Sequence, residues 1–125
     1  MVRRRSGIAL RDTSRVYFTL HDALLLELVF VGKVSTLAVE NARDKPTVVR
    51  RDTLLLDCEA MTEFESDAQA PTIRLLKDLR DLGIRRLACV APFSSQRVTM
   101  AALAFVAELD LELFRDRARA LLACT

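Results

Sequence analysis

Two hydrophobic runs near the N-terminus have the alternation and composition of strands. Residues 15–20 and 24–31 are rich in β-branched and aromatic side chains, which fit a pleated, half-buried surface. His21, Asp22 and Ala23 separate the two runs and favour a tight turn. The pattern therefore predicts an antiparallel hairpin at the start of the fold.

Two later runs, residues 53–58 and 86–91, are short and almost continuously apolar. Such runs are typical of strands that are covered on both faces, so both are expected at the centre of a sheet. Asp57 is expected near the end of the first run, and residues 59–65 are expected to form a polar connection. A further run, residues 111–114, predicts a brief final strand.

Four segments have apolar residues at helical spacing, and capping residues mark where they begin. Ser66 and Gln69 have the spacing of a capping box at the start of a helix that ends before Gly83. Ser94 or Ser95 is expected to cap the third helix. Asp116 is expected to cap the fourth, and the first covers residues 35–43.

The predicted order is β-β-α-β-α-β-α-β-α. A strand, helix and strand in succession favour parallel pairing. The fold class is therefore α/β, with a mixed sheet, an N-terminal antiparallel hairpin, later strands parallel, and about four helices. We expect a single domain over residues 14–125, preceded by a basic flexible tail at residues 1–13.

The composition argues against several classes of function. A net charge of +2, from 19 basic and 17 acidic residues, provides no broad positive field for nucleic acid. No apolar run reaches the ~20 residues needed to cross a bilayer, and no signal peptide is recognisable. The three cysteines are widely spaced and are expected to be small buried apolar residues. We expect a cytoplasmic protein that binds neither nucleic acid nor membrane.

The succession of these motifs resembles the STAS domain, the fold of bacterial anti-sigma factor antagonists, in the divergent form grouped with SEC14-like domains. The matching parts are residues 54–58, residues 64–67, the helix to Leu82, the strand from Gly83 to Val90, and residues 111–122. The resemblance implies a non-catalytic regulatory module that docks a kinase-like or sensory protein. It also implies a second reading, a SEC14-like binder of a small apolar ligand.

By this resemblance Ser66 occupies the position of the family's phosphorylatable serine or threonine. Phe64 stands in place of the family's aspartate, Glu65 in place of its first serine, and Asp67 in place of its glycine. Ser66 is therefore a candidate phospho-acceptor or partner contact, with a plain helix cap as the alternative. Phe64, Glu65, Asp67 and Gln69 form the candidate partner surface.

Ser94 and Ser95 follow a predicted strand and could contact an anion at the start of the third helix, with capping as the alternative. No metal site, cofactor or catalytic residue is predicted. His21 is the only histidine and is expected to be an exposed turn residue, so a histidine pair cannot form. Asp57 lacks the partners of a phospho-accepting receiver site and is interpreted as structural.

The predicted third helix, residues 98–109, is apolar on more than one face. Such a helix is expected to be buried on more than one side. The cover could come from the same chain or from a second subunit, so a homodimer is one of the expected arrangements. The alternative is that the free face binds an apolar ligand.

Overall fold

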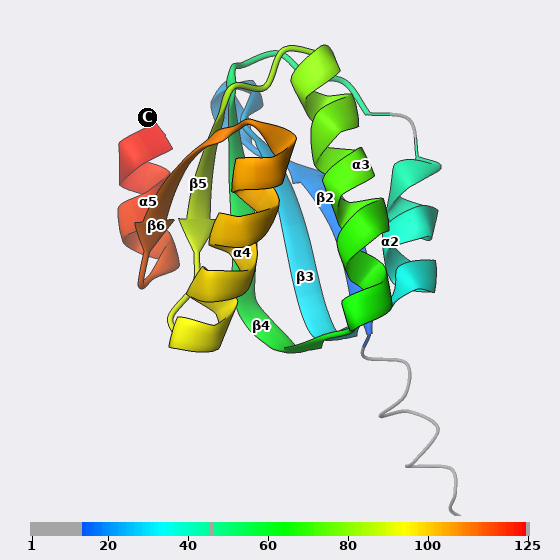
Figure 1. Ribbon diagram of the computed structural model, residues 1–125. Coiled ribbons are helices and arrows are strands. Elements are labelled where there is room, and N and C mark those ends of the chain that lie inside the picture. The colour runs from blue at the N-terminus through cyan, green and yellow to red at the C-terminus, as the bar shows by residue number, and fades with distance from the viewer. Residues whose placement is uncertain (1–13, 46, 125) are drawn as a thin grey trace, which may run out of the picture.

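The computed structural model describes residues 14–45 and 47–124. The predicted tail, residues 1–13, lies outside this range. Five strands form one mixed sheet in the order β2-β3-β4-β5-β6 (Figure 1). β2 runs antiparallel to β3 and the other neighbours are parallel, which confirms the predicted α/β class. The strands are β2 Arg15–Leu20, β3 Leu26–Val34, β4 Thr53–Phe64, β5 Arg86–Val90 and β6 Asp110–Phe114.

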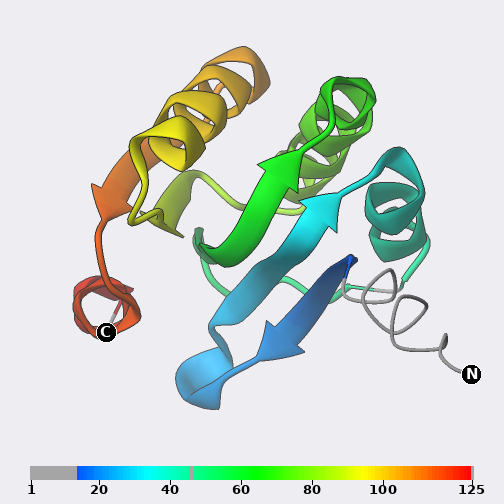
Figure 2. The ribbon, with the colours of Figure 1, turned by 90° about the horizontal axis from the view of Figure 1, so that it is seen from below.

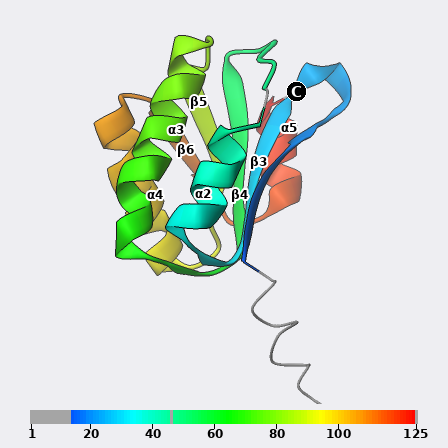
Figure 3. The ribbon, with the colours of Figure 1, turned by 90° about the vertical axis from the view of Figure 1, so that its right-hand side faces the viewer.

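Within the part of the chain that the structure describes, four α-helices cover the sheet unequally. Three of them lie on one face, and α5 lies alone on the other (Figures 2 and 3). The helices are α2 Thr36–Arg43, α3 Gln69–Asp81, α4 Ser94–Ala107 and α5 Arg117–Cys124. None of the described helices combines the length and the apolar character needed to span a membrane.

The two central strands separate two hydrophobic clusters. Leu54 and Leu56 of β4 belong to the large core under α2, α3 and α4, whereas Leu55 points into a small core under α5. All three leucines are buried, as expected because successive side chains of a strand alternate between faces. The prediction that residues 53–58 and 86–91 lie at the centre of the sheet is confirmed.

The predicted polar connection at residues 59–65 is wrong for most of its length, because β4 continues to Phe64. The cause is the neighbouring strand β3, whose ladder with β4 extends to the pair Val34 and Phe64. The ring of Phe64 also packs edge-on against Phe30, with 6.5 Å between centroids. Asp57 accordingly lies inside a strand and not at its end.

The predicted capping box of Ser66 and Gln69 is also wrong. A 3₁₀ turn, Ser66–Ala68, intervenes before α3, and the amide of Ala68 donates to the carbonyl of Glu65 at 2.9 Å. Ala68 therefore takes the N-cap position, and no side chain caps the helix. The hydrogen bonds of this turn satisfy backbone amides at the start of the helix that a serine side chain would otherwise have bonded.

Two other predicted helix limits are confirmed, and one is not. Asp116 Oδ1 accepts the amide of Arg119 at 2.9 Å and so caps α5. α3 ends before Gly83, whose φ of +121° lies in the region that favours glycine. The predicted cap by Ser94 or Ser95 is wrong, because Phe93 occupies the N-cap position of α4.

Candidate functional site

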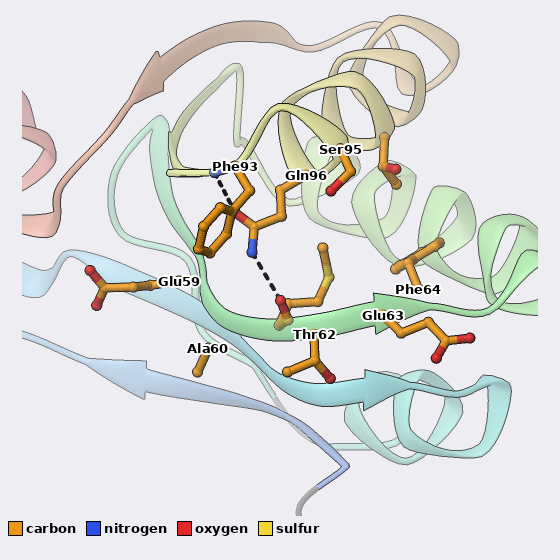
Figure 4. A pocket seen from close by; sticks show the side chains of 10 residues that line it. Glu59, Ala60, Thr62, Glu63, Phe64, Phe93, Ser95 and Gln96 are labelled. Atoms are coloured by element: carbon orange, nitrogen blue, oxygen red, sulfur yellow. Dashed lines mark hydrogen bonds between the residues drawn. The ribbon is translucent and has the colours of Figure 1, made fainter.

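A groove lies where β4 extends past its neighbour. The ladder between β4 and β5 ends at the pair Asp57 and Val90, whereas β4 continues to Phe64. Within the described residues, no strand pairs with this part of β4 on the β5 side. The first turn of α4 takes that place (Figure 4).

Gln96 fastens α4 to the unpaired edge of β4. Its side-chain amide donates to the carbonyls of Cys58 at 2.8 Å and Met61 at 2.9 Å, and its Oε1 accepts the amide of Phe93 at 3.1 Å. Gln96 is itself buried, so these bonds are shielded from water and hold the turn firmly. The adjacent Phe93 is left 63% exposed.

The groove has a volume of about 630 Å³ and a mixed lining. Phe93 and Phe64 supply aromatic surface, while Glu59 and Glu63 place carboxylates along the strand (Figure 4). The hydroxyl of Ser95 lies at the helix end of the groove. An open apolar surface rimmed by acidic groups has the composition of a binding site for a partner with apolar and basic groups.

A second group of polar residues, which we call the ionic cluster, lies on the α5 face of the sheet. Its centre is Glu27 of β3, which is only 2% exposed. Glu27 Oε1 is 2.6 Å from Nη2 of Arg117 and 2.5 Å from Nε2 of His21, and it accepts from Thr19 at 3.1 Å. Asp57 lies 3.4 Å from Arg117 Nε.

The surroundings in the ionic cluster shift the pKa values of its two carboxylates in opposite directions. Burial by itself raises the pKa of Glu27, but hydrogen bonds from Arg117 and His21 outweigh it and hold the pKa below the ordinary value. Burial raises the pKa of Asp57, against the lowering effect of the Glu59 amide. Arg117 therefore stabilises mainly the charged form of Glu27. Its ion pairs with Glu27 and Asp57 hold α5 against the sheet.

His21 is therefore not the exposed turn residue that the sequence suggested. It is partly buried and pairs with Glu27. The hairpin turn folds back because the amide of His21 donates to the carbonyl of Leu25 at 2.8 Å. The ionic cluster was missed because Glu27 interrupts an apolar run, and only its burial within a strand signals that it needs partners.

The predicted cysteine role is confirmed, since Cys58, Cys89 and Cys124 are free and buried. Burial, with Cys89 nearby, raises the pKa of the Cys58 thiol, which keeps it protonated and unreactive. Among residues 14–45 and 47–124, no group of histidine, cysteine and carboxylate side chains is arranged to hold a metal ion.

Comparison with known proteins gives a structural relative. No protein family model matches the chain, and no curated protein matches its sequence. A crystal structure of an uncharacterized protein from the DUF3478 family, with a SpoIIAA-like fold, from Shewanella loihica PV-4, superposes with a TM-score of 0.65 at 15% identity. The match covers 89% of this chain and 94% of that one. The chain has a SpoIIAA-like fold. The predicted STAS-like architecture is thereby confirmed for a divergent sequence.

Within the SpoIIAA-like fold, the sequence-predicted site residues fall into two neighbouring sets. Phe64 and Ser95 line the groove, although they come from different elements. Ser66 and Asp67 are exposed in the turn that follows β4, and Gln69 is exposed as the first residue of α3. All three lie outside the groove lining.

The other predicted residues flank these two sets. Glu65 is partly buried and lies 3.5 Å from Lys33 Nζ. Ser94 is exposed as the first residue of α4 and does not line the groove. Sequence reasoning did not single out Phe93, Gln96, Glu59 or Glu63 for the site, because they come together only when α4 crosses the edge of β4.

Proposed function

We propose that this protein is a non-catalytic partner-binding module of the anti-sigma-antagonist kind, and that the groove beside the Ser66 turn is its docking surface. The exposed ring of Phe93 carries the proposal. A phenyl ring that is 63% exposed beside a groove gains most when a partner covers it. The SpoIIAA-like fold adds support by analogy only.

The charges of the surface define the partner. Glu59 and Glu63 line the groove, and Glu65 and Asp67 continue the acidic surface into the turn. A protein that presents basic residues around an apolar side chain complements this surface. Phosphorylation of Ser66 would add about −1.5 to −2 charges beside Glu65 and Asp67, and would alter binding through repulsion or through new contacts with the partner's basic groups.

Variants of exposed residues test the docking surface. A partner captured from native cytosol and identified by mass spectrometry is titrated against the purified chain by calorimetry. We expect Phe93→Ala to weaken binding at least about tenfold, and Ser66→Glu to change it as well. Leu37→Ala is the control, because Leu37 is 70% exposed on α2 and lies outside the groove. Equal affinity of wild type, Phe93→Ala, Phe64→Ala and Ser66→Glu would exclude this surface.

The apolar part of the groove favours a second candidate function, a SEC14-like binder of a small apolar ligand. Met61, Phe64 and Phe93 supply the lining for it. Native mass spectrometry of freshly purified protein checks this candidate. Retained ligand mass that disappears in Phe93→Ala would favour a carrier, whereas a clean apo mass together with partner binding favours the docking module.

A further inference from the structure

The outer face of α4 is an apolar stripe that the described chain leaves uncovered. It consists of Val98, Ala101, Ala102 and Phe105, all exposed, with Phe105 83% exposed and Val98 70% exposed. Steps of three and four residues place these side chains on one side of the helix. The opposite side, including Met100 and Leu103, is buried in the large core.

The neighbouring helix α3 shows what an outer face looks like when water covers it. The exposed positions of α3 include Arg74, Lys77, Asp78 and Asp81. By contrast, Arg97 is the only charged residue within α4. Scattered exposed apolar residues are ordinary on a protein surface, but a continuous uncharged stripe beside a charged helix marks a surface that another molecule covers.

The stripe has a nearly symmetric sequence, with a large side chain at each end and two alanines at its centre. Val98 and Phe105 stand at its ends, and Ala101 and Ala102 stand between them. The midpoint between the two alanines is also the midpoint between Val98 and Phe105. An antiparallel copy of the same helix therefore places Phe105 against Val98 at both ends, and the small alanines at the crossing allow close approach of the helices.

Charge also favours the antiparallel copy. Arg97 lies in the first turn of α4 and Glu108 is its C-cap residue. At 3.6 residues per turn, their Cα atoms fall on the same flank of the stripe, near opposite ends of the helix. In the antiparallel arrangement, Arg97 of each copy lies within about 3 Å, along the helix axis, of the level of Glu108 in the other. A parallel two-fold arrangement places Arg97 and Glu108 of the two copies at different levels and therefore lacks this pairing.

Within the described residues, both side chains keep part of their hydrogen-bonding capacity. Nη1 of Arg97 donates to the carbonyls of Ala91 at 3.0 Å and Pro92 at 2.9 Å. Glu108 pairs with Arg80 at 2.5 Å, yet its side chain is 75% exposed. A carboxylate accepts several hydrogen bonds, so Glu108 can accept from a second arginine without releasing Arg80.

We propose that the stripe of Val98, Ala101, Ala102 and Phe105 is the interface of a two-fold symmetric homodimer, in which α4 packs antiparallel against α4 of a second copy. The same patch serves both subunits, so the contact closes on itself and does not propagate. The interface is small for a permanent complex, and the dimer therefore dissociates on dilution.

Sedimentation velocity over a protein concentration range from about 1 µM to about 1 mM tests the proposal, since weak protein complexes dissociate in this range. The wild-type chain shifts from monomer to dimer as concentration rises. Phe105→Glu raises the dimer dissociation constant at least about tenfold, because it buries a charge at the interface. Leu37→Glu, which introduces the same charge at another exposed apolar residue, on α2, leaves the constant unchanged. Circular dichroism verifies that both variants fold.

Two further variants test the antiparallel geometry. Ala101→Cys lies next to the two-fold axis and forms a disulfide-linked dimer in oxidising buffer, whereas Leu37→Cys does not. Arg97→Glu weakens the dimer, and adding Glu108→Arg restores it, because the opposite charges again face each other. A wild-type chain that is monomeric throughout the range would overturn the proposal. A dimer that Phe105→Glu leaves intact would do the same.

Discussion

The two faces of the sheet are stabilised in different ways. On one face, side chains of β3, β4 and β5 meet α2, α3 and α4 in a continuous apolar core. On the other face, a small apolar cluster lies under α5, and the ionic cluster around Glu27 stands beside it. One face thus depends on the amount of apolar surface buried, and the other on directed polar contacts with few partners.

Neighbouring leucines of β4 provide the most direct comparison of the two faces. Leu56→Ala opens a cavity in the large core and should cost about 3–4 kcal/mol of unfolding free energy. Leu55→Ala removes the same atoms on the α5 face, where one short helix can settle into the space, and should cost about 2–3 kcal/mol. Urea denaturation measures both values. A larger loss for Leu55→Ala would reverse the assignment of the main core.

The ionic cluster predicts the next largest effect. Arg117→Met keeps the aliphatic stem but leaves Glu27 buried without its main partner, and should cost about 2–3 kcal/mol because Arg117 is itself partly exposed. Arg119→Met is the control, since Arg119 is 79% exposed and, among the described residues, forms its ion pair with Asp116, the cap residue of α5. The control should change stability by less than about 0.5 kcal/mol. Equal effects of the two substitutions would show that the cluster does not hold α5.

The two carboxylates of the ionic cluster should respond to pH with opposite sign. The pKa of Glu27 is lowered on folding, so its stabilising contribution is complete above its ordinary value of 4.5 and is lost as pH falls through the folded pKa. The pKa of Asp57 is raised above its ordinary value of 3.8. The folded state therefore favours its protonated form, and its charge lowers stability as pH rises through the folded pKa.

Unfolding curves of Glu27→Gln and Asp57→Asn from pH 7 to pH 3 measure these contributions. Glu27→Gln should be less stable than wild type at pH 7, and the difference should narrow as pH falls below 4.5. Asp57→Asn should be at least as stable as wild type at pH 7, with a difference that vanishes in acid. A pH-independent difference for Glu27→Gln would contradict the role of its charge.

The smallest effects concern the residues that the sequence marked as caps. Asp116→Ala should cost about 1 kcal/mol, because the carboxylate accepts the amide of Arg119 at the start of α5. Ser66→Ala and Ser94→Ala should each cost less than about 0.5 kcal/mol, since neither serine caps a helix. Thermal unfolding of the three variants measures these losses of stability. A loss of about 1 kcal/mol for Ser66→Ala would instead support the predicted capping box.

The order of the elements and the centre of the sheet could be predicted from the sequence. The apolar runs at residues 53–58 and 86–91 were sufficient to locate the centre, because a short continuous hydrophobic run is typical of a strand that is covered on both faces. Asp116 was also recognisable as a cap, since a cap bonds to an amide three residues away. Part of the candidate site followed as well, since Phe64 and Ser95 both line the groove.

The length of β4 and the side chains that meet at its edge depend on tertiary packing and could not be predicted from local patterns. Pairing with β3 turned an expected connection into strand, which exposed the edge that Gln96 fastens. Glu27 likewise met a partner that lies 90 residues further along the chain. Local patterns specify local bonds, but the register between distant elements depends on the packing of the whole sheet, and that register placed the groove and the ionic cluster.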